Sequence, residues 1–180
     1  YRADEPYEAV IADCLALIAL AADTAQTRTF AFRGRSADPF ARAEWLTVAE
    51  AFQRTAGIDL LATIGGGEGD RDALTGAARG KMRVADDDTW SDIFSKILVE
   101  HVEPHLGQGR PTVLYEYPAP ESALARAKPS DPRVSERFEI YACGVELANG
   151  FGELTDAHEQ RRRFELAMDD KERLYGERYP

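Results

Sequence analysis

The sequence predicts an α+β fold, in which strands between residues 111 and 154 form an antiparallel sheet that helices flank. Three observations predict this class. Residues 137–153 alternate polar and apolar side chains around a Cys-Gly pair, as a β-hairpin does. Residues 111–117 form another strand-like run. Apolar residues recur at helical spacing before and after these strands, and such segregation of strands and helices is typical of an α+β domain.

The first part of the chain predicts three helices and one strand. In chain order these are a helix over 6–22, a strand over 27–33, a helix over 44–55 and an amphipathic helix over 89–105. An acidic residue before Pro6 would open the first helix, and the second would end before Gly57. The apolar side of the last helix is formed by Trp90, Ile93, Phe94, Ile97 and Leu98. Glycine-rich residues 65–69 lack the Lys-Ser/Thr of a phosphate-binding loop, and we interpret them as a flexible linker.

The hairpin is predicted from residues 135–141 and 145–151, which would be its two strands. Cys143-Gly144 would form the tight turn between them, with glycine supplying a positive φ. The strand order then follows directly from the chain, because a short turn can only join antiparallel neighbours.

Three carboxylates recur at seven-residue intervals along this hairpin, namely Glu139, Glu146 and Glu153, with Asn149 and Phe151 between the last two. Carboxylates in an apolar, strand-forming stretch are costly unless a cation neutralises them. Across an even-numbered loop, Glu139 and Glu146 share a face, which favours a common cation such as a divalent metal ion on a nucleotide. Strict alternation places the other residues opposite Glu146, so a single pocket requires a β-bulge near residues 148–150. The alternative is a solvated acidic hairpin at a sheet edge.

A final helix is predicted from Thr155 or Asp156 onward, with Glu159 in position to complete a capping box. The helix is highly charged. We therefore interpret its cluster of three arginines, residues 161–163, as a solvated face.

Two other groups of reactive residues are not expected to form sites. His101 and His105 are four residues apart, but Pro104 disrupts the helical turn between them and the acidic residue is misplaced for a metalloprotease motif. Cys14 and Cys143 are far apart and have no recognisable histidine partner, so neither a disulfide nor a nucleophilic cysteine is expected.

The amino-acid sequence of the hairpin resembles that of a known family. Glu146-Leu-Ala-Asn-Gly-Phe151, followed by Glu153-Leu-Thr-Asp156, resembles the signature of class II lysyl-tRNA synthetases, and more closely that of their paralogue, the elongation factor P–lysine ligase family. Upstream runs agree in order and spacing, namely Pro111-Thr-Val-Leu-Tyr-Glu-Tyr-Pro118, Ser122-Ala-Leu-Ala125 and Asp131-Pro-Arg-Val134. The resemblance is strong over residues 111–165 and loose over 1–110.

This resemblance implies a partial class II aminoacyl-tRNA synthetase-like catalytic domain over residues 1–180. Residues 34–110 would form a helical, insertion-like region, and residues 111–180 would carry the strand pair, the final helix and the site. The family's first motif (the dimer interface), its second and its third have no match here. The chain therefore looks like an internal segment, inactive on its own, of a protein that is expected to be a homodimer at full length.

The resemblance implies ATP and Mg²⁺ as cofactors and adenylate formation as the chemistry. Glu139 and Glu146 match the family's carboxylates for the magnesium ions on ATP. No residue of this chain is expected to act as a covalent nucleophile, because such chemistry depends on in-line positioning and charge neutralisation.

The amino acid site is implied by five further matches. Glu153 matches the carboxylate that receives the side-chain ammonium of lysine, and Tyr1 matches a tyrosine that borders the same ammonium. Asn149 matches the contact to the carboxylate end of the amino acid, and Phe151 the pocket wall. Ala148 stands where the synthetases usually have glycine and the protein ligases alanine. Its methyl group is expected to reshape the pocket in favour of β-lysine over α-lysine.

Composition limits the partners. The 180 residues suit about one domain, and 22 basic against 32 acidic residues give a net charge of −10. That charge argues against a large phosphate-binding surface, so a protein acceptor, elongation factor P, suits the chain better than tRNA. The apolar run over 10–22 is interrupted by Asp13 and is too short to span a membrane, so a soluble, cytoplasmic protein is expected. Two alternatives stay open, a lysyl-tRNA synthetase and a non-catalytic lysine- or nucleotide-binding paralogue.

Overall fold

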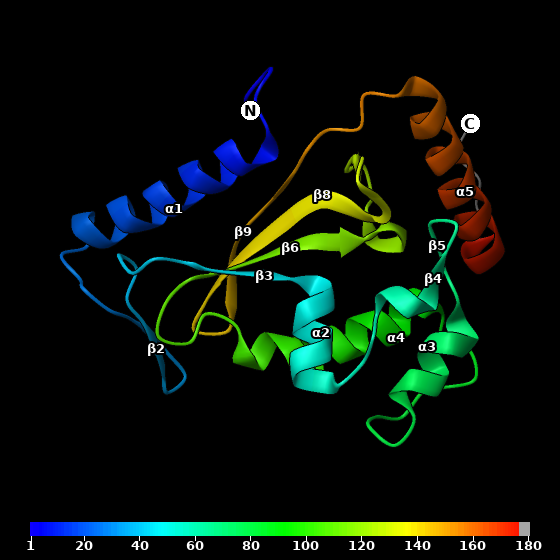
Figure 1. The fold of residues 1–180 in the computed structure, drawn as a ribbon, viewed down its shortest axis with the longest axis horizontal. Coiled ribbons are helices and arrows are strands. Elements are labelled where there is room, and N and C mark those ends of the chain that lie inside the picture. The colour runs from blue at the N-terminus through cyan, green and yellow to red at the C-terminus, as the bar shows by residue number, and fades with distance from the viewer. Residues whose placement is uncertain (177–180) are drawn as a thin grey trace.

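The computed structural model describes residues 1–176, whose helices and strands are shown in Figure 1. The α-helices are α1 (Tyr7–Thr24), α2 (Val48–Ala56), α3 (Arg71–Ala78), α4 (Trp90–Ile97) and α5 (Ala157–Tyr175). The strands of the main sheet are β3 (Glu44–Thr47), β6 (Thr112–Pro118), β7 (Ala127–Lys128), β8 (Asp131–Ala142) and β9 (Val145–Phe151). Helix α1 covers one face of this sheet, and α2 and α4 pack against the other.

Strand β8 organises the sheet. It pairs with β6 along one edge, and it pairs with β7 and β9 through successive parts of its own length. All three pairings are antiparallel, which confirms the predicted sheet between residues 111 and 154. Strand β3 adds a parallel neighbour to β6 that was not predicted.

The predicted helix over 44–55 is wrong in its first turn. Residues Glu44–Thr47 form β3, and the helix begins after Thr47, whose side chain accepts a hydrogen bond from the backbone N–H of Glu50. The Glu50 carboxylate accepts in return from the N–H of Thr47, which completes a capping box. The predicted end before Gly57 is confirmed, since Gly57 has the left-handed conformation of a C-terminal cap.

Two short hairpins lie outside the main sheet. Strands β1 (Phe30–Phe32) and β2 (Arg35–Ala37) form the first, so only the end of the predicted strand over 27–33 is paired. Strands β4 (Ile64–Gly65) and β5 (Glu68–Gly69) form the second. The residues predicted as a flexible linker are therefore a tight turn, after which Asp70 caps α3.

The predicted helix over 89–105 is shorter and is continued by irregular turns. Helix α4 is followed by a π-helical stretch, Leu98–Val102, and a 3₁₀ turn, Glu103–His105. Pro104 lacks the N–H that a continuing α-helix requires, which accounts for the change. The predicted apolar side is confirmed: Trp90 and Phe94 stack at 5.4 Å, and Phe94 stacks on Phe52 of α2 at 5.1 Å.

The start of α5 agrees with the prediction, but the capping box does not form. The Asp156 side chain accepts hydrogen bonds from the N–H groups of His158 and Glu159. The Glu159 carboxylate accepts from the guanidinium groups of Arg162 and Arg163 instead of from the Asp156 backbone. Among residues 1–176, no helix is long and apolar enough to cross a membrane.

Candidate active site

The turn between β8 and β9 has the geometry that was predicted. Cys143 and Gly144 both have positive φ, 56° and 71°, as a two-residue hairpin turn requires. The backbone N–H of Cys143 donates to the carbonyl oxygen of Gly107, and that of Gly144 donates to Leu106. The loop after the 3₁₀ turn thus holds the hairpin in place.

A β-bulge at Leu147 brings the polar residues onto one face. Tyr141 pairs with Glu146 and Ile140 pairs with Ala148, so Leu147 is an extra residue without a partner on β8. Glu146 and Asn149 therefore share a face although they are three residues apart. The predicted bulge is confirmed, one residue earlier than the predicted range.

Glu139 lies at the centre of this face and is 5% exposed. One carboxylate oxygen, Oε1, accepts a hydrogen bond from the Arg137 guanidinium at 2.8 Å and a longer one from the Asn149 amide at 3.4 Å. The other, Oε2, accepts from the Tyr141 hydroxyl at 2.6 Å. The Arg137 guanidinium also stacks over the Tyr117 ring at 4.5 Å. These hydrogen bonds compensate the Glu139 carboxylate for the loss of water around it, which a buried charge requires.

A third carboxylate, Glu103, faces this group from the 3₁₀ turn after α4. The Tyr141 hydroxyl lies 3.5 Å from Glu103 Oε1. Burial, followed by repulsion from Glu139, raises the pKa of Glu103 above its usual value. The same two causes raise the pKa of Glu146. The sequence did not single out Glu103, because its approach to β8 depends on how distant elements pack.

The carboxylates fit a nucleotide-bound magnesium ion better than a metal cage made by protein alone. Within residues 1–176 there is no group of three or more His, Cys, Asp or Glu side chains placed to hold a metal ion. Mg²⁺ commonly binds through one or two carboxylates together with substrate phosphates. Glu139 and Glu146, on one face and mutually repelling, supply that number of ligands.

A cavity of about 700 Å³ lies between the N-terminal segment and the end of β9. Four of the predicted amino acid-binding residues line it together: Tyr1, Asn149, Phe151 and Glu153. Of the two arginines in its wall, Arg2 pairs with Glu5 and Asp13, and Arg126 pairs with Glu136. In the part of the chain that the structure describes, the Glu153 carboxylate has no hydrogen-bond or ion-pair partner. Asp4 also lines the cavity without such a partner, so Glu153 and Asp4 are its unpaired carboxylates within the described residues.

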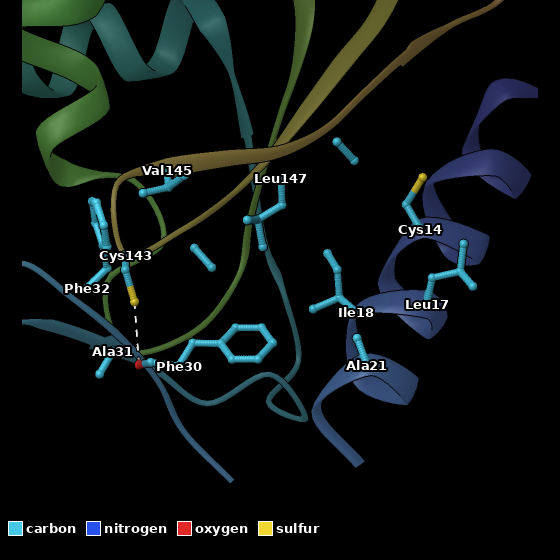
Figure 2. Close-up of a pocket in the computed structure, with 12 residues that line it drawn as sticks. Cys14, Leu17, Ile18, Ala21, Phe30, Ala31, Phe32, Cys143, Val145 and Leu147 are labelled. Atoms are coloured by element: carbon cyan, nitrogen blue, oxygen red, sulfur yellow. Dashed lines mark hydrogen bonds between the residues drawn. The ribbon is translucent and has the colours of Figure 1, made fainter. Parts of the chain in front are cut away.

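Ala148 is not part of this cavity. It lies on the opposite face of β9, where it packs with Tyr7, Ile11 and other residues under α1. It also lines a separate apolar cavity of about 540 Å³, between α1 and the tip of the hairpin. Figure 2 shows Leu147 pointing into that space from the hairpin, with Ile18 pointing in from α1. The structure thus does not bring Ala148 together with the other predicted binding residues.

The two histidines lie in different kinds of turn. His101 lies in the π-helical stretch and His105 ends the 3₁₀ turn, so the two are not on one regular helix. Within residues 1–176, neither belongs to a group of three or more His, Cys, Asp or Glu side chains that could hold a metal ion.

Comparison with known proteins identifies the family of this chain. The chain matches the family model of the class II tRNA synthetases (D, K and N) over residues 10–177. It is 45% identical over 134 residues to an elongation factor P–(R)-β-lysine ligase of Klebsiella pneumoniae, and 44% identical over 132 residues to one of Haemophilus influenzae. Each alignment covers 73% of this chain and 39% of the relative. The chain therefore spans about two fifths of the length of these curated relatives.

Proposed function

This chain belongs to the class II tRNA synthetases (D, K and N), and on that premise we propose that its protein activates lysine or β-lysine with ATP and transfers it to a lysine of elongation factor P. In the first step, a carboxylate oxygen of the amino acid attacks the α-phosphorus, and the bond to pyrophosphate breaks. In the second, the acceptor amine attacks the acyl carbon, AMP leaves with the bonding electrons, and the amine loses a proton.

The observation that carries the proposal is the cavity that Glu153 shares with Asn149 and Phe151. An unpaired carboxylate in a walled cavity suits the distal ammonium of a lysine-type substrate. A substrate without that ammonium would leave the charge unpaired, which provides selectivity. Asn149, whose amide also reaches Glu139, would hold the carboxylate end of the amino acid beside the nucleotide.

Glu139 and Glu146 would hold Mg²⁺ on the opposite side of Asn149 from Glu153. The ion would supply neutralisation of phosphate charge during attack. Arg137 and Tyr141 fix both oxygens of Glu139 before any ligand arrives, so this carboxylate is pre-organised.

Amino acid-dependent pyrophosphate exchange by the full-length protein tests this assignment. Glu153→Gln keeps the shape and removes the charge, so the KM for lysine should rise roughly ten- to a hundredfold, as for one charge-assisted hydrogen bond. Glu5→Gln is the matched control, because Glu5 lines the same cavity but already pairs with Arg2. Unaltered exchange with lysine in Glu153→Gln would show that the ammonium binds elsewhere.

The acceptor is tested separately. A protein acceptor is supported by the net charge of −10 and by the likeness to elongation factor P–(R)-β-lysine ligases. Ala148 does not contribute to this choice, because it lies away from the cavity. Radiolabelled lysine and β-lysine should label purified elongation factor P and leave bulk tRNA largely uncharged. Robust charging of tRNA would identify a lysyl-tRNA synthetase instead.

The proposal includes a homodimer, as the family resemblance implies, and a cytoplasmic location, as the composition favours. Light scattering on the full-length protein measures the mass directly, and a monomer would contradict this part of the proposal without affecting the assignment of Glu153.

A further inference from the structure

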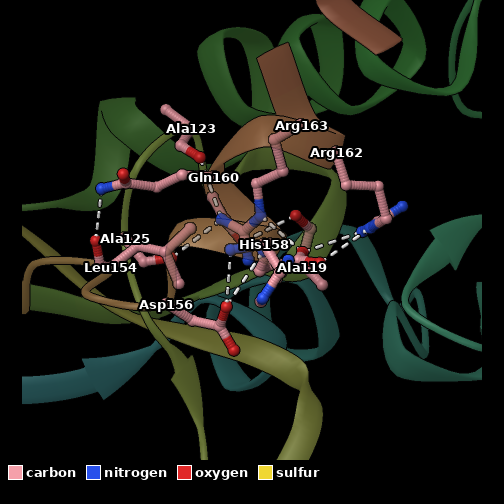
Figure 3. Close-up of polar contacts among 11 residues, drawn as sticks. Ala119, Ala123, Ala125, Leu154, Asp156, His158, Gln160, Arg162 and Arg163 are labelled. Carbon is pink, nitrogen blue, oxygen red and sulfur yellow. Dashed lines mark hydrogen bonds and ion pairs between the residues drawn. The ribbon is translucent and has the colours of Figure 1, made fainter. Parts of the chain in front are cut away.

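Arg163 of α5 is not part of a solvated face, which corrects the interpretation of the cluster over 161–163. Its side chain is 19% exposed, against 56% for Arg162. As Figure 3 shows, one Arg163 nitrogen donates to the carbonyl oxygens of Ala123 and Ala125, each at 2.9 Å. A second nitrogen of the same group donates to Glu159 at 2.8 Å.

The segment that Arg163 holds is the one that pairs with Glu153. Ala125 and Glu153 form an isolated antiparallel bridge. On either side of it, the N–H of Arg126 donates to the Gly152 carbonyl oxygen at 2.8 Å, and the N–H of Leu154 donates to Leu124 at 3.0 Å. The backbone of Glu153 is thus placed by a two-stranded pairing whose outer partner is fastened to α5.

Helix α5 also holds the other side of this pairing. The Gln160 side chain donates to the Leu154 carbonyl oxygen at 2.6 Å (Figure 3). The outer segment needs such support because Ala123 has a φ of +48°, a conformation that is unfavourable for a residue with a Cβ. Since the Glu153 carboxylate has no partner of its own within residues 1–176, its position depends on this backbone.

We propose that Arg163 is a positioning residue for substrate selection: by holding the carbonyl groups of Ala123 and Ala125, it fixes where Glu153 stands in the amino acid cavity. The expected effect of Arg163 on lysine binding rests on the proposed function. Its effect on the position of the Glu153 backbone rests on the structure alone. Arg163 itself does not line the cavity.

Two measurements on Arg163→Ala in the full-length protein separate these parts. Amide hydrogen exchange at Arg126 and Leu154 should become faster, because both N–H groups belong to the pairing. In pyrophosphate exchange, the KM for lysine should rise about five- to tenfold, with the KM for ATP unchanged. Arg162→Ala is the matched control, since Arg162 pairs with Glu159 on the same helix but contacts no carbonyl of the segment.

The outcomes are distinct. Unaltered hydrogen exchange at both amides overturns the positioning role, whether or not the protein activates lysine. Faster hydrogen exchange together with an unaltered KM for lysine overturns the link to selectivity. If Glu153→Gln also has an unaltered KM for lysine, the proposed function itself is wrong. If Arg163→Ala fails to fold, Arg163→Lys replaces it. Lysine retains a cation that can reach one carbonyl, so it should show smaller changes in the same two quantities.

Discussion

The Tyr141 hydroxyl donates a 2.6 Å hydrogen bond to Glu139 Oε2, and the same oxygen of Tyr141 lies 3.5 Å from Glu103. A neutral donor thus stands between two carboxylates. The Tyr141 hydroxyl stabilises the charge of Glu139 by donating to Oε2, while the Arg137 guanidinium donates to the other carboxylate oxygen, Oε1. The arrangement leads to the first two predictions.

Removing the Tyr141 hydroxyl should weaken nucleotide binding. Tyr141→Phe removes the hydrogen bond that holds Glu139 Oε2 and the donor that lies between Glu139 and Glu103. The KM for magnesium-bound ATP should therefore rise about fivefold, as for one net hydrogen bond. The KM for lysine should not change. Tyr115→Phe is the control, because Tyr115 lies on the adjacent strand β6 and its hydroxyl has no hydrogen-bond partner within residues 1–176. Equal effects in the two variants would contradict the prediction.

Glu103 should make the stability of the fold depend on pH. Its pKa is raised in the folded protein, so the folded state keeps the proton to higher pH than the unfolded chain. Stability is therefore lost as pH rises from the ordinary carboxyl range, about 4.3, through the raised pKa. Glu103→Gln cannot ionise, and its Tm relative to the parent should increase between pH 4 and pH 7.

The expected gain is below about 1 kcal/mol, because Glu103 is partly exposed and its repulsion is screened. Glu100→Gln, an exposed position one turn earlier, serves as the control and should shift the Tm equally at both pH values. A Tm difference for Glu103→Gln that stays constant with pH would rule out the expected linkage.

Glu146→Gln should weaken nucleotide binding and leave amino acid binding unchanged. Loss of one of the two proposed magnesium ligands should raise the KM for ATP roughly tenfold and make binding less dependent on Mg²⁺ concentration. Lysine recognition should be spared, the reverse of Glu153→Gln. Nucleotide titration across a series of Mg²⁺ concentrations measures this, and a loss of lysine affinity in Glu146→Gln would argue against the division of roles.

Replacing Gly107 by alanine should destabilise the fold far more than replacing Gly109. Both have positive φ, but a Cβ at Gly107 would lie 2.4 Å from Ala142 Cα, whereas a Cβ at Gly109 would meet no atom within 4 Å. Gly109→Ala should therefore cost about 1 kcal/mol of unfolding free energy through backbone strain alone. Gly107→Ala should cost about 3 kcal/mol or more. Chemical denaturation gives both values, and similar costs would show that the contact with the hairpin relaxes freely.

The family, the fold class and the hairpin could be predicted from sequence because their signals are local. The two-residue period, the Cys-Gly turn and the spacing of the carboxylates all lie within residues 137–153. The family match and the sheet confirm the class. The pairing of β3 with β6 joins residues that are far apart in the chain, and four residues of a parallel strand carry no periodicity that distinguishes them from a helix start.

The site was predicted in part for the same reason. Residues of the hairpin were found, but Glu103 and Arg163 act across distances that no local pattern reports. The structure places Ala148 on the face of β9 that packs under α1, which the family resemblance could not indicate because it gives a position in the chain and not a face of the strand. The role of Ala148 in substrate choice stays a prediction. The roles of Glu139, Glu146, Asn149, Phe151, Glu153 and Tyr1 stay predictions.

The placement of Ala148 has a consequence for how substrate range can change. A methyl group lets α1 approach the back of β9, and the same helix supplies Tyr7 and Val10 to the wall of the amino acid cavity. A larger side chain at position 148 would push the helix outward and widen the cavity from behind. Under the proposed function, a substitution at position 148 would therefore alter the choice between amino acids of different length without lining the cavity.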